Sequence, residues 1–279
     1  MPELPEVETV RRALAPVLEN HYVADVYVGR DDLRWPLPKN LAARLLGRRF
    51  TSVDRRGKYV LMNLEPQDIL LLHLGMSGSI RISRTPPTLG KHDHIMLTMA
   101  VNPTTAATHY VVLNDPRRFG WVDLFPAAHR DTHKLLRNMG LEPLGNAFSA
   151  MHLQTVFNGR RGPVKNALLN QRLIAGIGNI YANEALFHAG ISPRRIAATI
   201  KGRRAERLAA AVVKTLREAI EDGGTSLRDH VQPGGEIGYF VRRLAVYGRG
   251  GQPCQVCTTL IKTLVQSGRS SFYCPRCQA

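Results

Sequence analysis

The spacing of hydrophobic residues changes along the chain and separates a strand-rich first part from a helical second part. Apolar residues recur at helical spacing between Val7 and Leu18, which predicts an amphipathic helix. Short aliphatic and β-branched runs follow, bounded by turn-forming residues. They predict strands at Val23–Val28, Thr51–Val53, Tyr59–Leu64, Ile69–Leu74, His94–Met99 and His109–Leu113. Such a series of short strands is typical of an antiparallel sheet assembly.

From about Asp131 onward the spacing becomes helical. We expect helices at His133–Met139, Met151–Phe157, Val164–Leu169, Ile180–Ala189 and Gly202–Glu221. Pro143 and Gly145 mark a linker between the two parts. The sequence therefore predicts an α+β protein with an N-terminal domain at 1–131, a linker at 132–150, a helical domain at 151–238 and a C-terminal unit at 239–279.

Charge narrows the choice of partner. Lys and Arg number 38 against 22 for Asp and Glu, giving a formal net charge of +16. A field of this size favours a polyanionic partner, although a generally basic protein remains an alternative. The most apolar stretch, Val60 to Ile80, is interrupted by polar residues, so no membrane span is expected. Glu3, Glu6 and Glu8 lie where a signal peptide would be apolar, so we expect a cytoplasmic protein.

All four cysteines fall in the C-terminal unit as two C-x2-C pairs, Cys254 with Cys257 and Cys274 with Cys277. This spacing predicts a tetrahedral Zn²⁺ site on a hairpin ribbon, with two disulfides or free thiols as the alternative. Four sulfur ligands leave no open position, so the ion would be structural. The polar residues between the pairs, including Arg269, either contact phosphates or are simply solvated.

The N-terminus offers a nucleophile. Pro and Glu near Met1 are common at a helix start, and that role alone would explain them. Removal of Met1, however, would leave Pro2 as a secondary amine. Attack of such an amine on a sugar C1′ gives an iminium ion, which is an electron sink for eliminations.

Several segments, in order along the chain, make the sequence resemble the formamidopyrimidine-DNA glycosylases. They are Met1 to Glu8, Gly57 to Tyr59, His73 to Gly78, Lys91 to His94, Asp115 to Gly120, Gly176 to Ala182, Gly238 to Phe240, Tyr247 to Arg249 and the cysteine ribbon. The resemblance covers essentially the whole chain. It implies an N-terminal antiparallel β-sandwich flanked by helices, a helix–two-turn–helix domain and a β-hairpin zinc ribbon.

The resemblance also implies roles for residues near the N-terminus. Pro2 would be the nucleophile, and Glu3 would be the acid/base group at the sugar ring oxygen. Lys58 would act as a catalytic and phosphate-positioning cation. Glu6 would support the same network, with helix-start electrostatics as an equal alternative.

A base in a duplex must leave the stack before its sugar can be attacked, and inserted side chains fill the gap. By resemblance, Met76 and Phe119 are apolar wedges and Arg117 contacts the orphaned base. Without the resemblance, Met76 and Phe119 would be interpreted as core residues.

Further residues would hold the DNA backbone. Asn179 follows two glycines at a helix start, where backbone amides can approach a phosphate. By resemblance, Asn179, Arg269, Lys58 and His73 would grip phosphates, with Tyr247 and Lys165 assisting. The glycine-containing segment 225–240 would correspond to a mobile loop over the flipped base.

The resemblance implies a monomeric, bacterial-type base excision repair enzyme, cytoplasmic and associated with the nucleoid. It would excise oxidised purines from damaged double-stranded DNA and then cut the strand. Two alternatives remain: an oxidised-pyrimidine glycosylase of the endonuclease VIII type, and a non-catalytic lesion-binding zinc-ribbon protein. Leu4 differs from the glycine usual in the first, and Pro2, Glu3 and Lys58 argue against the second. The Lys91 to His94 segment is interpreted as structural.

Overall fold

The structure is a computed structural model that describes residues 2–225 and 238–279. The chain forms two compact units, Met1–Arg137 with Gly223–Tyr239, and Asn138–Asp222 with Phe240–Ala279. The division into 1–131, 132–150, 151–238 and 239–279 stays a prediction. The grouping differs from it, because Phe240–Ala279 belongs to the same unit as Asn138–Asp222 and the linker is divided between the two units. Gly223–Tyr239 joins the first unit, where Thr225 pairs with Tyr239 and the Thr225 amide donates to Glu6.

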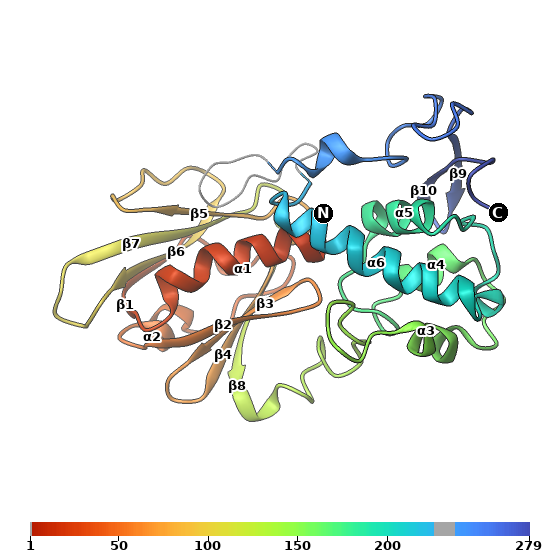
Figure 1. The fold of residues 1–279 in the computed structure, drawn as a ribbon. Coiled ribbons are helices and arrows are strands. Elements are labelled where there is room, and N and C mark those ends of the chain that lie inside the picture. The colour runs from red at the N-terminus through yellow and green to blue at the C-terminus, as the bar shows by residue number, and fades with distance from the viewer. Residues whose placement is uncertain (1, 226–237) are drawn as a thin grey trace. The chain divides into compact units, whose positions relative to one another are not determined.

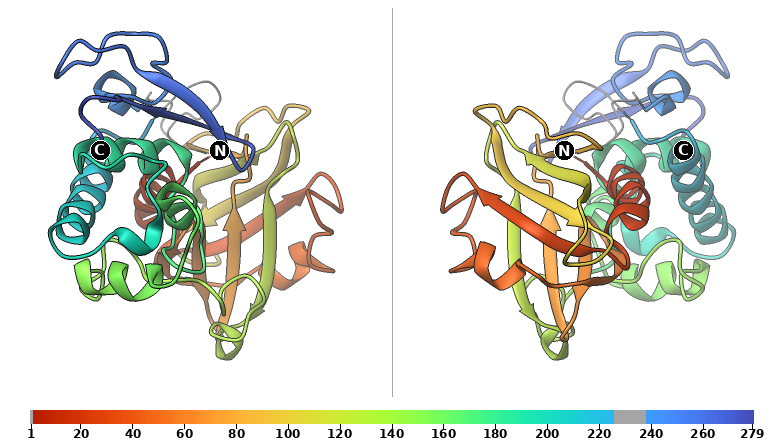
Figure 2. Two further views of the ribbon diagram at one scale, coloured as in Figure 1. Left: turned by 90° about the vertical axis from the view of Figure 1, so that its right-hand side faces the viewer. Right: turned by 90° about the vertical axis from the view of Figure 1, so that its left-hand side faces the viewer.

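The first unit is a β-sandwich with α1 (Leu4–Leu18) packed against it (Figure 1, Figure 2). One antiparallel sheet has the order β1 (Tyr22–Val28), β6 (Asp93–Ala100), β7 (Ala107–Asn114), β5 (Ser79–Ser83). The other has the order β2 (Phe50–Arg56), β3 (Tyr59–Leu64), β4 (Asp68–His73), β8 (Trp121–Pro126). A single apolar core containing Leu14, Val60 and Leu97 joins α1 to both sheets.

Two connections cross from one sheet to the other. Residues 74–78 lead from β4 to β5, and residues 115–120 lead from β7 back to β8. Because β4 pairs with β8 and β5 pairs with β7, the two connections start and end beside each other. We call these two segments the crossover loops.

The second unit is helical and carries a two-stranded hairpin. Its helices are α3 (Ala150–Phe157), α4 (Val164–Leu169), α5 (Asn179–His188) and α6 (Arg203–Glu221), and its strands are β9 (Lys262–Gln266) and β10 (Arg269–Tyr273). Helix α6 is strongly amphipathic, with Leu208, Val212 and Leu216 buried. Short helices complete the two units: α2 (Leu41–Leu45), η1 (Ala127–His129), η2 (Ala197–Thr199) and η3 (Phe240–Arg243).

The predicted α+β fold class is confirmed, and the six predicted strands all form. Strands β5 and β8 were not predicted. The helix predicted at His133–Met139 is wrong: the segment forms turns, and of its residues only Leu136 is buried. The His133 ring stacks on Phe125 and its Nε2 bonds to Asp123, so the segment is anchored by one side chain instead of an apolar helical face.

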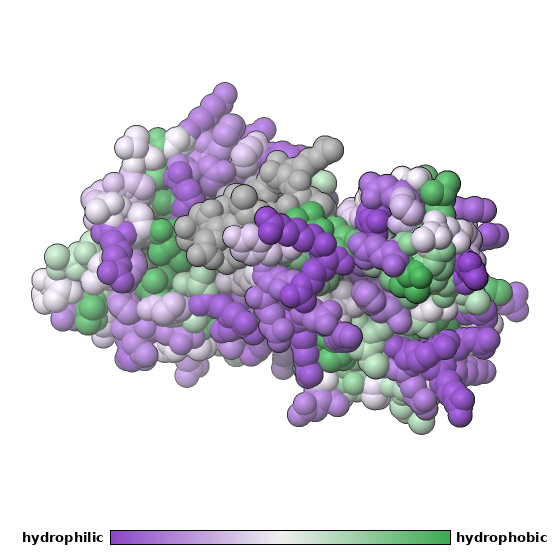
Figure 3. Space-filling view, turned by 45° about the horizontal axis from the view of Figure 1, so that its top comes forward, coloured by the Kyte–Doolittle hydropathy of each residue, from purple (hydrophilic) through white to green (hydrophobic). Residues whose placement is uncertain are grey.

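Hydrophilic residues predominate on the face of the molecule drawn in Figure 3, as the excess of basic residues leads one to expect. Within the described ranges, no helix has both the length and the apolar character needed to cross a membrane.

Candidate active site and metal centre

The carboxylate of Glu6 organises the N-terminal residues. Glu3 and Glu6 are 3% and 2% exposed, and Pro2 is buried beside them. Glu6 Oε2 accepts a hydrogen bond from the Glu3 amide at 2.7 Å, as in one half of a capping box. Its Oε1 accepts from the Thr225 amide at 2.8 Å. One buried carboxylate therefore fixes the backbone next to Pro2 and ties it to the segment at Thr225.

A glycine at position 224 leaves room for the hydrogen bond between the Thr225 amide and Glu6. A Cβ at this position would lie 3.1 Å from Glu6 Oε1, and its φ of +84° is unfavourable for other residues. The loop expected over the flipped base begins directly after this point, but residues 226–237 lie outside the described residues.

A chain of hydrogen bonds links α1 to the turn that carries Lys58. Arg55 on β2 donates to Glu8 Oε2 at 3.1 Å and to the Gly57 carbonyl at 3.0 Å. Burial alone would raise the pKa of Glu8, but hydrogen bonds and positive charges, led by those of Arg11 and Arg55, outweigh it and lower the pKa. Lys58 follows at once and is only 7% exposed. These hydrogen bonds connect helix α1 to the turn that carries Lys58.

His73 lies close to Lys58. Tyr59 pairs with His73 across β3 and β4, and their ring centroids are 4.9 Å apart. Burial, followed by the charges of Lys58 and Arg34, lowers the pKa of His73 to about 4. Its Nδ1 accepts the Gly75 amide at 3.1 Å, so the proton of the neutral ring is on Nε2. His73 is therefore an uncharged donor beside a cation, a pair suited to a phosphate.

The crossover loops present the expected wedge residues. Met76 is 41% exposed and Phe119 is 39% exposed, so the alternative interpretation as core residues is wrong. The guanidinium carbon of Arg117 lies 4.8 Å from the centre of the Phe119 ring. This contact orients both side chains together.

In the second unit, Ser270 brings several of the predicted residues together. Asn179, the first residue of α5, donates from Nδ2 to the Ser270 carbonyl at 3.0 Å. Lys165 Nζ donates to the same carbonyl at 2.8 Å and to Ser271 Oγ at 2.6 Å. Arg269, one residue earlier, is exposed. Asn179 and Arg269 thus both lie next to Ser270 on β10.

Lys165, which we expected to assist at the DNA backbone, lies inside the protein. Its side chain is 0% exposed and its ammonium group is engaged by the hairpin, because α4 packs the residue inward. Lys165 instead holds the backbone beside Arg269.

Tyr247 is held by a residue that the sequence did not reveal. Glu184 on α5 is fully buried and accepts the amides of Ala245, Val246 and Tyr247 at 2.8, 3.0 and 2.8 Å. The Tyr247 ring also contacts Phe272, with centroids 5.2 Å apart. A buried Glu in a helix carries no sequence signal that distinguishes it from a surface Glu.

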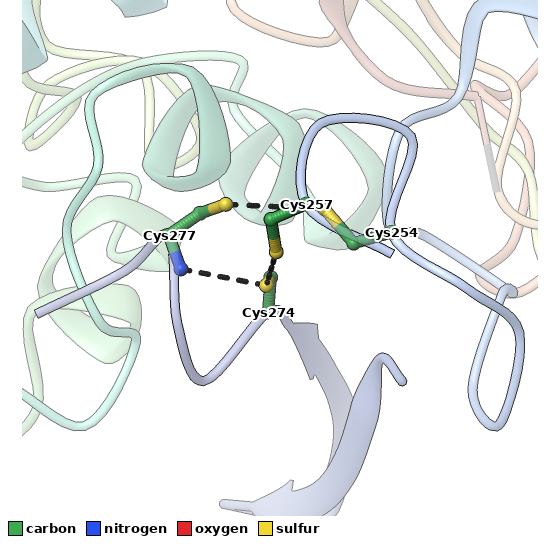
Figure 4. A group of neighbouring side chains, drawn as sticks. All are labelled: Cys254, Cys257, Cys274 and Cys277. Atoms are coloured by element: carbon green, nitrogen blue, oxygen red, sulfur yellow. Dashed lines mark hydrogen bonds between the residues drawn. The ribbon is translucent and has the colours of Figure 1, made fainter. Parts of the chain in front are cut away.

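The four cysteines converge, as Figure 4 shows. Their Sγ atoms all lie within 4.8 Å of one another, with Cys254 to Cys277 at 3.9 Å and Cys257 to Cys274 at 3.4 Å. Zn–S bonds of about 2.3 Å at tetrahedral angles place sulfurs about 3.8 Å apart. The donor set therefore fits one structural Zn²⁺. No disulfide joins any two of these four cysteines, so the disulfide alternative is wrong.

The segment from Lys91 to His94 does not form a second metal site. In the part of the chain that the structure describes, no group of His, Cys, Asp or Glu other than the four cysteines could hold a metal ion. Asp93 instead accepts from the Gly90 amide, Arg81 and Asn114, which fits the structural interpretation of this segment.

Family models match most of the chain. Residues 1–122 match the formamidopyrimidine-DNA glycosylase N-terminal domain, residues 139–231 its H2TH domain, and residues 251–279 a zinc finger found in FPG and IleRS. These matches define a DNA glycosylase with an H2TH domain and a zinc finger.

Full-length relatives agree. The formamidopyrimidine-DNA glycosylase of Jannaschia sp. is 53% identical over 100% of both chains. The crystal structure of MutM (Fpg) from Thermus thermophilus has a TM-score of 0.86 at 39% identity, covering 99% of this chain and 98% of that one. A Lactococcus lactis Fpg complex with DNA containing Fapy-dG has a TM-score of 0.87 at 28% identity, covering 99% of each chain. The chain belongs to the formamidopyrimidine-DNA glycosylase family.

Proposed function

We propose that this glycosylase excises oxidised purines, 8-oxoguanine and formamidopyrimidines, from damaged double-stranded DNA, and then cleaves the strand. Full-length membership of the family supports the reaction class, and the Lactococcus lactis relative binds DNA containing Fapy-dG. The basic excess of 38 over 22 residues suits a duplex partner.

The chemistry would start at Pro2 once Met1 is removed. The amine of Pro2 bonds to C1′ of the flipped nucleotide and loses its proton, and the glycosidic bond breaks with its electrons leaving on the base, which takes up a proton. Glu3 delivers a proton to the sugar ring oxygen, which opens the ring and leaves an iminium ion. Loss of a C2′ proton then expels the 3′ phosphate, and a second elimination expels the 5′ phosphate.

The observation that carries this proposal is the arrangement around Glu6. A side chain that only capped α1 would not also need a buried bond to Thr225, 219 residues away. The two bonds hold Glu3 and Pro2 in one position, and pre-positioned groups lower the barrier of such a step. Lys58 and His73 would hold a phosphate next to the reacting sugar.

Binding to the remaining backbone would fall to the second unit. We assign Asn179 and Arg269 to phosphates, with Tyr247 beside them. The Zn²⁺ held by the four cysteines supplies no chemistry to the reaction and keeps the hairpin folded. We also propose a monomer in the cytoplasm at the nucleoid, which the charge and the bacterial relatives support.

Borohydride trapping tests the nucleophile. Duplex DNA with one 8-oxoguanine opposite cytosine is incubated with enzyme and reductant, and trypsin releases the peptide from Pro2 to Arg11. The expected adduct is on this peptide, at the Pro2 nitrogen. A Pro16→Ala variant, which changes an exposed proline in the helix that follows Pro2, should trap as well as wild type. An adduct on a lysine peptide would overturn the assignment, and absence of any adduct with tight binding retained would favour a non-catalytic lesion binder.

A further inference from the structure

The crossover loops are joined through the carboxylate of Asp115, a residue without an assigned role. Asp115 is 0% exposed. Its Oδ1 accepts the Ser77 hydroxyl at 2.7 Å, and its Oδ2 accepts the Gly120 amide at 2.7 Å. Ser77 belongs to one crossover loop and Gly120 to the other. One buried carboxylate therefore holds both loops at once.

Ser77 extends this connection toward the side chain expected to contact the orphaned base. While its hydroxyl donates to Asp115, its oxygen accepts the Arg117 amide at 3.2 Å. The Asp115 carbonyl accepts the Arg118 amide at 3.2 Å and also contacts His94 Nε2 at 2.9 Å. The backbone on both sides of Arg117 is thus fixed from within the protein.

The loops also touch directly. A Cβ at Gly75 would lie 2.3 Å from the carbonyl carbon and oxygen of Phe119, so the two backbones are in van der Waals contact there. Gly75 also has a φ of +62°. Met76 follows Gly75, and Phe119 is the other wedge. Any change in the separation of the loops would therefore move Met76 and Phe119 relative to each other.

We propose that Asp115 and Ser77 are positioning residues that lock the crossover loops together and thereby determine how strongly excision depends on the base opposite the lesion. The inference rests on the proposed function, because it takes Arg117 as the residue that contacts that base. Neither residue touches DNA in this role. Their effect reaches the DNA through the direction of the Arg117 side chain.

The physical basis is geometric precision. A hydrogen bond discriminates between bases only if its donor is held in place, since a mobile guanidinium can adapt to several partners. Loss of the Ser77 hydroxyl leaves Asp115 Oδ1 and the Arg117 amide without this partner, and the loop around Arg117 gains alternative conformations. The excision of the preferred pair should fall, while poorly matched pairs should lose little.

The test compares kcat/KM for one lesion placed opposite each of the four bases. In Ser77→Ala we expect the ratio between the best and the worst pair to shrink by about 10-fold, equivalent to about 1.4 kcal/mol. Asp115→Asn, which replaces one of the two carboxylate acceptors by an NH2 donor facing either Ser77 or the Gly120 amide, should shrink it further. The ratio does not depend on the fraction of active enzyme, so a loss of folded protein alone cannot mimic the effect.

Two controls complete the design. Ser52→Ala removes a partly buried serine that bonds to Asp54 and Asn63 on β2 and β3, far from the loops in sequence, and should leave the ratio unchanged. In an Arg117→Ala background, Ser77→Ala should change nothing more, because the path through Arg117 is already lost.

Each outcome decides a separate question. An unchanged ratio in Ser77→Ala, with excision by wild type intact, would overturn the inference. Wild-type excision that does not depend on the opposite base would also overturn it, since nothing would then be read there. Wild-type protein that excises no oxidised purine at all would instead contradict the proposed function.

Discussion

The burial of a neutral His73 makes the first unit sensitive to mild acid. The pKa of His73 is lowered from 6.5 to about 4, chiefly by burial and then by Lys58 and Arg34. In the unfolded chain the same ring would titrate near its ordinary value. Between these two pKa values the unfolded state binds more protons, so stability falls as the pH decreases from about 6.5 and levels off below about 4.

The size of the effect follows from the same two values. The full gap corresponds to about 3.4 kcal/mol at low pH, and at pH 5 the unfolded state gains about 2 kcal/mol from protonation of this ring. Protonation of Nδ1 in the folded state would also break its bond to the Gly75 amide. The cost is therefore both electrostatic and geometric.

His73→Asn isolates this contribution. The Asn side chain can still accept the Gly75 amide, but it does not titrate. We expect wild type to lose about 2 kcal/mol more than His73→Asn between pH 7 and pH 5, measured by denaturant unfolding at both values. His188→Asn, at an exposed histidine at the end of α5, serves as the control. Parallel losses in wild type and His73→Asn would refute the reasoning, because other groups titrate equally in both.

Three further outcomes are expected. Glu184→Gln should lower the free energy of unfolding by about 2–3 kcal/mol and weaken DNA binding through Tyr247, because one of the three amides that Glu184 accepts loses its acceptor. The control Glu218→Gln on α6 should change the free energy of unfolding by less than about 0.5 kcal/mol. Calorimetry measures the stability of each variant, and DNA titration measures its affinity for DNA. Gly75→Ala should cost more than about 2 kcal/mol because its Cβ meets backbone at 2.3 Å, while Gly159→Ala, with φ of +70° and open space around it, should cost about 1 kcal/mol. Chelation of Zn²⁺ should unfold the cysteine hairpin and abolish DNA binding, and adding Zn²⁺ back should restore both. Circular dichroism monitors the fold and a binding assay monitors the affinity for DNA. DNA binding that persists in the zinc-free protein would contradict the role of the hairpin.

The local pattern of hydrophobic and turn-forming residues was sufficient to predict many of the helices and strands. The runs at Tyr59–Leu64 and Val164–Leu169 form strand β3 and helix α4 with the predicted bounds. In both segments the spacing of the hydrophobic residues and the positions of the flanking turn residues indicate the same element, and the hydrophobic residues face the core. At His133–Met139 the spacing of hydrophobic residues alone suggested a helix. The segment instead forms turns, held in place by the contacts of His133 with Phe125 and Asp123. Strands β5 and β8 were not predicted. In β5 only Ile80 is buried, so its hydrophobic pattern is weak.

The sequence by itself determined the zinc ligands and the family, because these depend on residue type and on spacing along the chain. Only the tertiary structure decided that Lys165 is buried, that Glu6 reaches Thr225 and that Asp115 joins the crossover loops. These relations depend on which strands and helices become neighbours. Long-range pairing brings together side chains that carry no mark of each other in the linear chain, and burial then makes their hydrogen bonds obligatory.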